Sequence, residues 1–452
     1  MEGKPEMNKQ KEADAEKRLS LDQAVKLAIA LQREGKLDQA EGIYKEIISV
    51  NPHHPDALHF LGVLHFQRGA TEAAIEAISK AIEAAPDYLD AHNNLGNIYM
   101  ETRRFDEAEA EYRRAVELAP DHIGARNNLG TVLRALKRFD EAETIFRDAL
   151  DDRPDFYPLH YNLGYLLHQK GEEEAAVDHF FKAVVLDPDQ ARSKVRLGLA
   201  LISLGRREEA EALYREWVEK EPDNPEACHL LAACSGDAVP GRASDDYVKS
   251  LFNRFAASFE EQLNILEYKA PELVAEAVSR HCGQPEGRLR ILDAGCGTGL
   301  CGPLLKPFAK RLDGVDLSAG MLKKAAAAGH YDRLTESDLM EYIRGQSGVY
   351  DAIVAADVLC YFGDLQEVFA AATDAIKPGG RFIFTVERMA ADTAGNNGDY
   401  RIIPQGRYTH AEAYVRRIAG ETGLMPEFID HEILRKEMGR PVDGLVVTLA
   451  RA

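Results

Sequence analysis

The chain has 452 residues, which is more than one ordinary hydrophobic core accommodates, so we expect at least two domains. A formal net charge of -20 disfavours nucleic acid as a partner, because its phosphates would be repelled over most of the surface. No apolar run approaches the length of a membrane span, and residues 1–20 read as a disordered, charged tail without the apolar core of a signal peptide.

From Leu21 to Asn224 the sequence resembles itself at a period of about 34 residues, without an insertion. Each of the six units has a leucine followed by a small residue, then an alanine, then a proline. The leucines are Leu27, Leu61, Leu95, Leu129, Leu163 and Leu197; the alanines are Ala40, Ala74, Ala108, Ala142, Ala176 and Ala210; the prolines are Pro52, Pro86, Pro120, Pro154, Pro188 and Pro222. Small residues let paired helices cross closely, and a proline ends each unit. This pattern is typical of tetratricopeptide repeats, so we predict an all-α solenoid over residues 21–234, with residues 225–234 as a capping helix.

Three central repeats place an asparagine directly before the leucine, at Asn94, Asn128 and Asn162. An amide donates and accepts hydrogen bonds at once, which suits the backbone of a peptide. The arrangement resembles the asparagine ladder in the tetratricopeptide superhelix of O-GlcNAc transferase, and this implies a peptide or protein bound in the concave groove. The alternative is that these amides only bond to neighbouring helices.

A Gly/Pro-rich break at residues 235–241 predicts a linker over residues 235–245, before a second domain at residues 246–452. Helical patterns follow at residues 246–263 and 271–281. Strand and helix patterns then alternate, which predicts a parallel sheet with helices on both faces. The expected strands are residues 289–294, 312–317, 333–336, 350–356, 381–386, 427–435 and 444–449, and the expected helices between them are residues 318–328, 365–376 and 409–422.

The stretch around which this domain is organised runs from Asp293 to Gly299. A buried strand ends in an acid, three alternating glycines follow, and a helical pattern resumes through Leu300 and Leu304. Glycines let the backbone turn tightly and let a ligand approach closely. The acid at the strand tip would repel a pyrophosphate and favours a ligand with an ammonium group. Asp316, about twenty residues past the first glycine, stands where an acid accepts hydrogen bonds from ribose hydroxyls.

The Asp293–Gly299 stretch, Asp316, Asp338 and the turn at residues 377–380 resemble, in order, the motifs of class I S-adenosylmethionine-dependent methyltransferases. The resemblance implies a Rossmann-like, seven-stranded domain whose last strand is antiparallel, with S-adenosylmethionine as cofactor and the aromatic helix at residues 246–263 as its lid. It assigns cofactor contacts to Asp293, Gly295, Cys296, Gly297, Thr298, Gly299, Asp316, Leu317, Met321, Asp338, Leu339, Ala356 and Asp357. Asp338 alternatively caps a helix, since aspartate is common at that position.

The candidates on the acceptor side are Tyr361 and His410 as catalytic residues, with Tyr361, Arg407, Tyr408 and Arg440 contacting the substrate. Arginines in this region, Arg435 among them, would clamp an anionic acceptor. The alternative is that His410 caps its helix and the arginines are surface charges. A base is needed only if the acceptor carries a proton at working pH.

The expected function is a methyltransferase acting on a peptide, protein or carrier-bound acceptor that the repeats recruit. One alternative is a small-metabolite methyltransferase whose repeats only dock a partner complex. Another is a repeat adaptor with an inactive sensing domain, although the intact glycine stretch and Asp316 favour an active enzyme. The six cysteines show no CxxC pair and no histidines at zinc spacing, so we expect no metal and reduced thiols in the cytoplasm.

Overall fold

The computed structural model describes residues 19–255, 263, 266–389, 398–437 and 440–452. These form two compact units, Met1–Arg196 and Leu197–Ala452, which are described one at a time. Most of the predicted tail, and the predicted helix beyond residue 255, lie outside the described residues. Among the described helices, none has the length and apolar character needed to cross a membrane.

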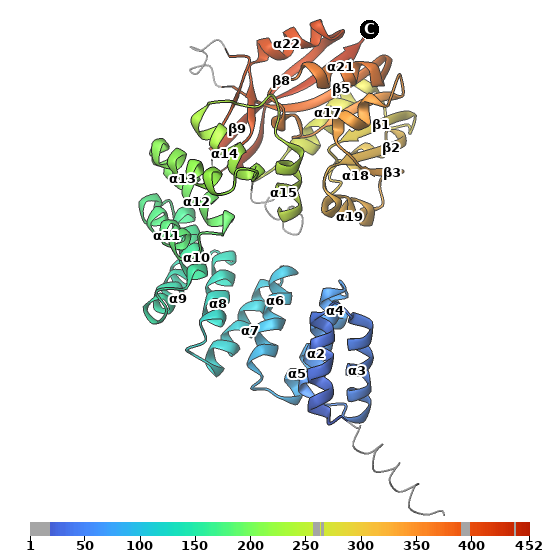
Figure 1. The fold of residues 1–452 in the computed structure, drawn as a ribbon. Helices are drawn as coiled ribbons and strands as arrows, with labels where there is room; N and C mark the ends of the chain where they lie inside the picture. Colours follow the sequence, from blue (N-terminus) through green and yellow to red (C-terminus); the bar gives the residue numbers. More distant parts are fainter. Residues whose placement is uncertain (1–18, 256–262, 264–265, 390–397, 438–439) are drawn as a thin grey trace, which may run out of the picture. The chain divides into compact units, whose positions relative to one another are not determined.

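The repeats are helix pairs, as the 34-residue period predicted, and α2 to α11 follow one another as stacked pairs in the first unit (Figure 1). The first helices of the pairs are α2 (Leu21–Arg33), α4 (Pro55–Gln67), α6 (Leu89–Glu101), α8 (Ile123–Ala135), α10 (Tyr157–Lys170) and α12 (Ala191–Ser203). The second helices are α3 (Leu37–Val50), α5 (Thr71–Ala84), α7 (Phe105–Leu118), α9 (Phe139–Asp152), α11 (Glu173–Leu186) and α13 (Arg207–Lys220). The extra helix α14 spans Pro225–Ser235.

Close approach of the two helices in a pair depends on the small residue of the first helix. In α8 this residue is Gly130, and a Cβ added there would lie 2.5 Å from Cε1 of Phe146 on α9. Phe146 is fully buried and fills the space between the helices. The repeat pattern is therefore a packing pattern, in which glycine on one helix accommodates an aromatic ring on its partner.

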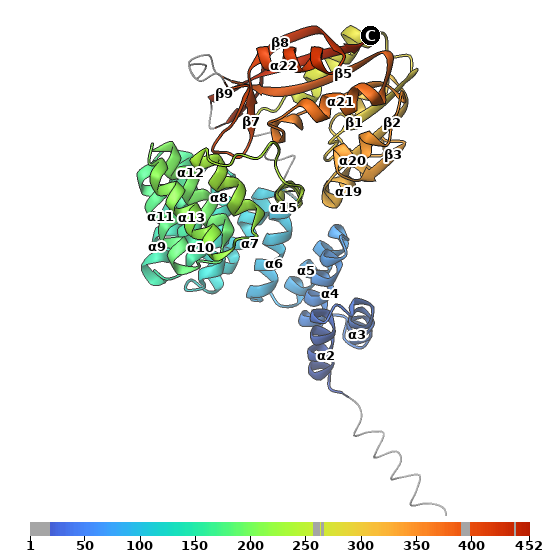
Figure 2. The ribbon, with the colours of Figure 1, turned by 45° about the horizontal axis from the view of Figure 1, so that its top comes forward.

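The C-terminal sheet has the order β3-β2-β1-β4-β5-β7-β6, in which β7 and β6 are short strands. Strand β5 also pairs with β9, and β9 pairs with β8. Strands β1 to β5 pair in parallel, β9 is antiparallel to β5, and β8 is antiparallel to β9. The bounds are β1 Leu289–Ala294, β2 Ala309–Asp316, β3 Arg333–Glu336, β4 Tyr350–Ala355, β5 Ile376–Arg388, β6 Tyr400–Ile402, β7 Tyr408–His410, β8 Leu424–Glu437 and β9 Arg440–Arg451. Seven of these strands follow the predicted class I pattern, and β1, β2 and β3 lie side by side at one edge (Figure 2).

Helices cover both faces of the sheet. One face packs against α20 (Leu339–Arg344), α21 (Gln366–Ala375) and α22 (Glu412–Glu421). The other packs against α17 (Ala270–Cys282) and the one-turn helix α18 (Gly302–Leu305). Helix α19 (Ala319–Ala328) contacts β2 and β3, and α15 (Asp245–Phe255) contacts α19. This double cover explains why β4 and the last four residues of β1 are almost continuously buried, as is β5 over residues 382–387.

Local structure departs from the prediction at three places. The predicted helix at residues 409–422 was wrong at its start, because Tyr408–His410 form strand β7 against β6 and α22 begins only at Glu412. The turn at residues 377–380 belongs to β5, where Tyr350 of β4 pairs with Ile376 before a register shift. The helix expected after the glycine turn is a single turn, since β2 already begins at Ala309.

Residues of the predicted linker are held by hydrogen bonds within the second unit. The Ala243 N–H donates to the Tyr361 carbonyl at 2.8 Å, and the N–H groups of Gly363 and Asp364 both donate to the Gly241 carbonyl. The Tyr408 hydroxyl donates to the Pro240 carbonyl at 2.8 Å. Residues 240–243 therefore pair with the loop that follows β4.

We predict that Gly130→Ala lowers the free energy of unfolding of the repeats by about 1 to 3 kcal/mol, because the added methyl group overpacks the buried Phe146 ring. Urea titrations of the full chain followed by circular dichroism measure this. The control is Gly42→Ala on α3, where nothing lies within 4 Å of an added Cβ. Gly42→Ala should raise the free energy of unfolding by roughly 0.5 to 1 kcal/mol, because alanine has the higher helix propensity. Equal changes in the unfolding free energy for Gly130→Ala and Gly42→Ala would contradict the packing role of Gly130.

Candidate functional site

Acidic side chains gather at the carboxyl ends of the parallel strands. Asp293 ends β1 next to the glycine turn, Asp316 ends β2, and Asp357 follows β4. Strand β1 pairs with both β2 and β4, so the glycine turn lies between the other two acids. In open parallel sheets ligands bind at this edge, where the strand order reverses.

The glycine turn has the backbone that the sequence predicted. Gly295, Gly297 and Gly299 have φ angles of 73°, 54° and 92°, which side-chain-bearing residues rarely adopt. A Cβ on Gly295 would collide with Val358, so the turn lies directly against the loop after β4. Thr298 Oγ1 is buried and has no hydrogen-bond partner within the described residues. A buried hydroxyl without a partner in such a turn indicates a place where a ligand completes the hydrogen bonding.

The Asp316 carboxylate is fixed by two backbone groups. Its Oδ2 accepts from the Gly297 N–H at 2.9 Å, and its Oδ1 accepts from the Ser318 N–H at 2.8 Å. Each oxygen keeps a second lone pair. Ser318 caps α19 as predicted, through the Met321 N–H, and its hydroxyl donates to Asn253 Oδ1 of α15 at 2.6 Å.

A pocket of about 280 Å³ opens beside these groups, at the ends of β2 and β3. Its lining residues are Asp245, Lys249, Leu317, Glu336, Ser337, Asp338 and Glu341. The Asp338 carboxylate uses Oδ1 to cap α20 through the Glu341 N–H, while Oδ2 pairs with Arg242 at 3.1 Å. Leu339, which follows in the chain, and Met321 of α19 are buried in the core.

Asp293 lies beneath the glycine turn. Its side chain is 1% exposed, and Oδ2 accepts from the Tyr331 hydroxyl at 2.6 Å. Burial, opposed by the Tyr331 hydrogen bond and reinforced by the Asp316 charge, raises the pKa of this carboxyl to about 7. The acid is therefore close to half-protonated at neutral pH, and it contacts the turn from below.

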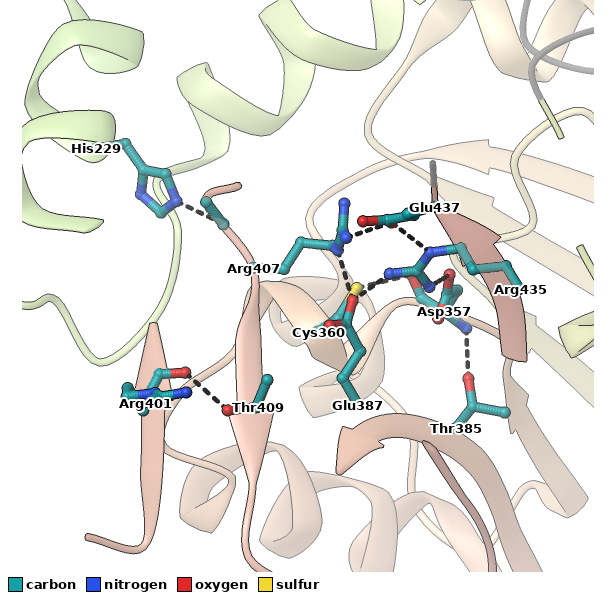
Figure 3. A network of polar contacts seen from close by, with 11 residues as sticks. His229, Asp357, Cys360, Thr385, Glu387, Arg401, Arg407, Thr409, Arg435 and Glu437 are labelled. Carbon is teal, nitrogen blue, oxygen red and sulfur yellow. Dashed lines mark hydrogen bonds and ion pairs between the residues drawn. The ribbon is translucent and has the colours of Figure 1, made fainter. Parts of the chain in front are cut away.

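On the other side of the turn, a buried network joins three carboxylates to two guanidinium groups (Figure 3). Arg435 of β8 is 3% exposed and pairs with Asp357 at 2.6 Å, with Glu437 at 2.7 Å and with Glu387 of β5. Arg407 pairs with Glu387 at 2.5 Å and with Glu437. When all five groups are ionised, the three carboxylates and the two guanidinium groups give this network a net charge of one negative unit.

Asp357 is the unusual member of this network. It has a φ angle of 57° without being glycine, and its N–H donates to Thr385 Oγ1 at 2.8 Å. Its Oδ1 is buried and has no partner among the described residues. Burial raises the pKa of this carboxyl, against the opposing effect of the Arg435 charge. Strained backbone and a buried unpaired oxygen together mark a functional position.

The structure changes the interpretation of the predicted acceptor residues. Arg407 is engaged by two carboxylates, so it does not offer a free charge to an anionic acceptor. Arg440 is exposed at the start of β9, and Tyr408 is buried with its hydroxyl on Pro240. His410 does not cap a helix: it is fully buried in β7, its Nε2 lies 3.2 Å from the Gly363 carbonyl, and burial lowers its pKa to about 4.

Two tyrosines remain close to Asp357. Burial raises the pKa of the Tyr361 hydroxyl well above its ordinary value, and its ring meets Phe252 of α15 edge to face at 5.5 Å. The pKa of Tyr268 is raised in the same way by burial and then by the Asp357 charge. Sequence reasoning missed Tyr268, Glu387 and Glu437. The position of Glu387 directly after the apolar run at residues 382–386 of β5 is the signal that could have indicated it.

These residues fit the S-adenosylmethionine that the resemblance implies. The glycine turn has the open backbone, Asp316 has lone pairs for two hydroxyls, and the pocket beyond it has room for a base. Within the described residues, no cluster of three or more histidine, cysteine or acidic side chains could hold a metal ion.

Comparison with known proteins agrees with this architecture. A model described as a methyltransferase domain matches residues 292–382, and tetratricopeptide-repeat models match residues 25–89, 87–155, 127–191 and 167–234. Methyltransferase-like protein 27 of Homo sapiens is 34% identical over 110 residues, which are 24% of this chain and 45% of that protein. The ubiquinone biosynthesis O-methyltransferase of Thiobacillus denitrificans is 27% identical over 154 residues, 30% of this chain and 65% of that enzyme.

Among solved structures, PilF of Pseudomonas aeruginosa matches with a TM-score of 0.41 and 20% identity, over 47% of this chain and 96% of that one. The chain spans about half to two thirds of the length of the methyltransferase relatives described above. The sheet and its site define a class I methyltransferase domain. The chain joins that domain to an array of tetratricopeptide repeats.

We predict that Asp293→Asn makes the chain more stable than the parent at high pH. The folded-state pKa lies above the unfolded value, so the folded parent holds a proton that the unfolded chain releases, and its stability falls as pH rises toward 7. Asparagine imitates the protonated acid. The difference in unfolding free energy should widen by roughly 2 kcal/mol between pH 5.5 and pH 8 in urea titrations of the full chain.

Asp332→Asn is the matched control for Asp293→Asn. Asp332 pairs with Lys306 and accepts from the Leu312 N–H, which lowers its pKa, so its contribution to stability is lost as pH falls. Between pH 5.5 and pH 8 Asp332 is ionised in both the folded and the unfolded chain. Asp332→Asn should therefore lower the free energy of unfolding by a constant amount over this range, while the difference between Asp293→Asn and the parent widens. If the difference in unfolding free energy between Asp293→Asn and the parent stayed constant across this pH range, Asp293 would be charged throughout in the folded chain.

Proposed function

We propose that the chain is an S-adenosylmethionine-dependent methyltransferase acting on a peptide, protein or carrier-bound acceptor that the repeats recruit. The observation that carries the proposal is the glycine turn between Asp316 and Asp357, at the strand edge of a domain that matches methyltransferases. When bound, S-adenosylmethionine supplies a methyl group already activated for displacement by the adjacent sulfonium.

On the cofactor side the residues bind and orient. The Asp316 carboxylate, held in place by Gly297 and Ser318, has lone pairs directed to the two ribose hydroxyls. Leu317 and Asp338 line the neighbouring pocket, where the adenine would lie, and Leu339 follows Asp338 in the chain. Gly295, Cys296, Gly299 and Ala356 form the backbone wall of the site, and the Thr298 hydroxyl supplies a further hydrogen bond.

On the acceptor side Asp357 is the central group. Its Oδ2 is fixed by Arg435, and its free Oδ1 accepts a hydrogen bond from an O–H or N–H group of the acceptor. A carboxylate whose pKa is raised by burial also accepts that proton more readily as the acceptor is methylated. Because the network keeps one negative charge, this site disfavours a carboxylate acceptor. Tyr268 and Tyr361, both partly exposed, lie near the same carboxylate.

The repeats would contribute the groove amides. Asn94, Asn128 and Asn162 each donate through Nδ2 to a residue of the preceding repeat, at 2.8 to 2.9 Å. The neighbouring-helix bonds that were the alternative to peptide binding are thus present. Their Oδ1 atoms accept no bond from the described residues, so one acceptor per repeat is available for a peptide N–H.

A small acceptor is the second candidate. It is favoured by the relatives whose names refer to ubiquinone biosynthesis, since those names indicate O-methylation in the synthesis of a small molecule. In that case the repeats would only dock a partner complex.

We predict that the full chain binds S-adenosylmethionine and its demethylated product in preference to NAD. Asp316→Ala should weaken this binding by on the order of 2 to 4 kcal/mol, which is the loss of charge-assisted hydrogen bonds. Calorimetry measures both. Because Asp316 also accepts two backbone N–H groups, Ser318→Ala serves as control. It removes the helix cap and the hydrogen bond to Asn253 but keeps the Asp316 carboxylate and the Ser318 N–H, so it should retain most of the affinity. Preferential binding of NAD would refute the cofactor assignment.

We predict that the label from methyl-tritiated S-adenosylmethionine, incubated with cell lysate and the full chain, appears in the protein or carrier fraction. Replacing Asn94, Asn128 and Asn162 together by alanine should raise the apparent KM for that acceptor and leave cofactor affinity unchanged, since binding energy from a remote surface appears in KM.

The matched control replaces Asn93 and Asn127 by alanine. This removes the side chains that accept from Asn128 and Asn162, but it keeps the groove amides themselves. It should leave KM close to the parent value. Label found only in small molecules, with the same KM in the triple variant, would instead establish the second candidate.

A further inference from the structure

Charge is divided unequally between the two helices of the central repeats. The first helices α8, α10 and α12 contain no aspartate or glutamate, whereas the second helices α7 and α9 contain five and six. The basic residues of the three first helices are Arg126, Arg134, Lys170, Arg192, Lys194 and Arg196. In a chain with a net charge of -20, three acid-free helices in succession define a distinct surface.

The first helices form the inner face of the array. Consecutive first helices contact one another directly, from α4 through α6 and α8 to α10. The bonds from Asn128 to Asn93 and from Asn162 to Asn127 cross the same contacts. The inner, more closely spaced face of a solenoid is its usual binding surface. Figure 2 shows α8, α10 and α12 with the second helices α9 and α11.

Arginine and tyrosine alternate on this inner face. The guanidinium carbons of Arg134 and Arg196 lie 4.6 Å and 4.7 Å from the centroid of the Tyr165 ring. The guanidinium carbon of Arg192 lies 5.9 Å from the centroid of the Tyr161 ring. Arg196 occupies the ladder position of Asn162 one repeat later. The ladder therefore continues, with a guanidinium in place of an amide.

Some of these cations are already paired, and two are not. Arg126 pairs with Asp152 and Lys170 with Glu143, each at 2.6 Å, so the second helices neutralise them. Arg192 is exposed and Arg196 half-buried, and neither has a carboxylate partner within the part of the chain that the structure describes. A guanidinium over a tyrosine ring is held there by cation–π attraction and still has N–H groups for a carboxylate.

We propose that this inner face, from α8 to residue 196, binds an extended acidic segment of a partner protein. Carboxylates of the segment pair with Arg192 and Arg196, and its backbone N–H groups donate to Oδ1 of Asn128 and Asn162. Charge complementarity selects the occupant, because Arg192 and Arg196 have no carboxylate partner among the described residues and lie on a helix without acidic residues in an acidic protein. The inference rests on the proposed role of the repeats in recruitment, but it concerns binding alone and requires no methyl transfer.

The test is fluorescence anisotropy of the full chain with a labelled peptide of alternating glutamate and glycine. The double variant Arg192→Gln, Arg196→Gln should bind it roughly 10- to 100-fold more weakly, as expected for two lost charge-assisted hydrogen bonds. The double variant with lysine at both positions should keep part of the affinity, since lysine retains the charge but not the planar stacking. Binding of the parent should weaken with added salt.

The control double variant is Arg147→Gln, Arg153→Gln, which changes the net charge equally but acts on and just after α9. It should bind the peptide like the parent. Equal weakening in both double variants would overturn the proposal, because binding would then depend on net charge only. The proposal would also be overturned if the parent bound a lysine–glycine peptide or a single-stranded oligonucleotide as tightly as it binds the glutamate–glycine peptide.

Self-association is measured by sedimentation of the parent and the Arg192→Gln, Arg196→Gln variant. A parent dimer that this variant abolishes would overturn the proposal in favour of a second copy of the chain as occupant. Peptide binding without detectable methyl transfer would support this inference and refute the proposed function. Methyl transfer without peptide binding would refute this inference alone.

Discussion

The buried guanidinium of Arg435 determines how the acceptor edge of the C-terminal sheet is built. It reaches from β8 to the ends of β4 and β5, where it contacts Asp357 and Glu387. A buried charge is tolerated only when it is paired, so these strands and the terminal hairpin depend on one another. Loss of Arg435 would leave three carboxylates with Arg407 as their one guanidinium partner in the network and would remove the ion pair of Asp357. Breaking a buried pair in this way costs about 3 to 5 kcal/mol. The antiparallel hairpin of this fold therefore helps to build the site as well as to cover the sheet.

Features that depend on local sequence were predictable to a high degree. The bounds of β1 and β3 agree with the predicted residues at both ends, and the six helix pairs follow the period of the repeats. The glycine turn has the expected backbone, because its three glycines adopt positive φ angles that other residues rarely adopt. Ser318 and Asp338 cap their helices for the same reason, since a cap needs only a side chain and the next turn.

Features that depend on partners distant in the chain could not be predicted. Three residues of β7 become a strand because β5 and β6 pair with them, although their sequence continues into a helix. His410 looked like a polar residue at a helix end, and only the fold shows that it is buried. The same holds for the arginines. Arg407 is separated from Glu387 and Glu437 by 20 and 30 residues, and no local pattern reveals that both carboxylates meet it.

The hydrogen bonds of residues 240–243 decide where this protein can be divided. In the second unit, the Gly/Pro-rich segment pairs with the loop after β4, and α14 extends the same attachment: His229 contacts the Gly406 carbonyl at 2.8 Å, and Ala233 packs with Ile402 and Tyr408. A cut at residue 243 would strip the β6–β7 hairpin of its cover and free the loop that carries Tyr361. A cut before Leu197 keeps these contacts. Transplanting this methyltransferase domain onto another scaffold would therefore require the last two repeat helices, α13 and α14, to be carried with it.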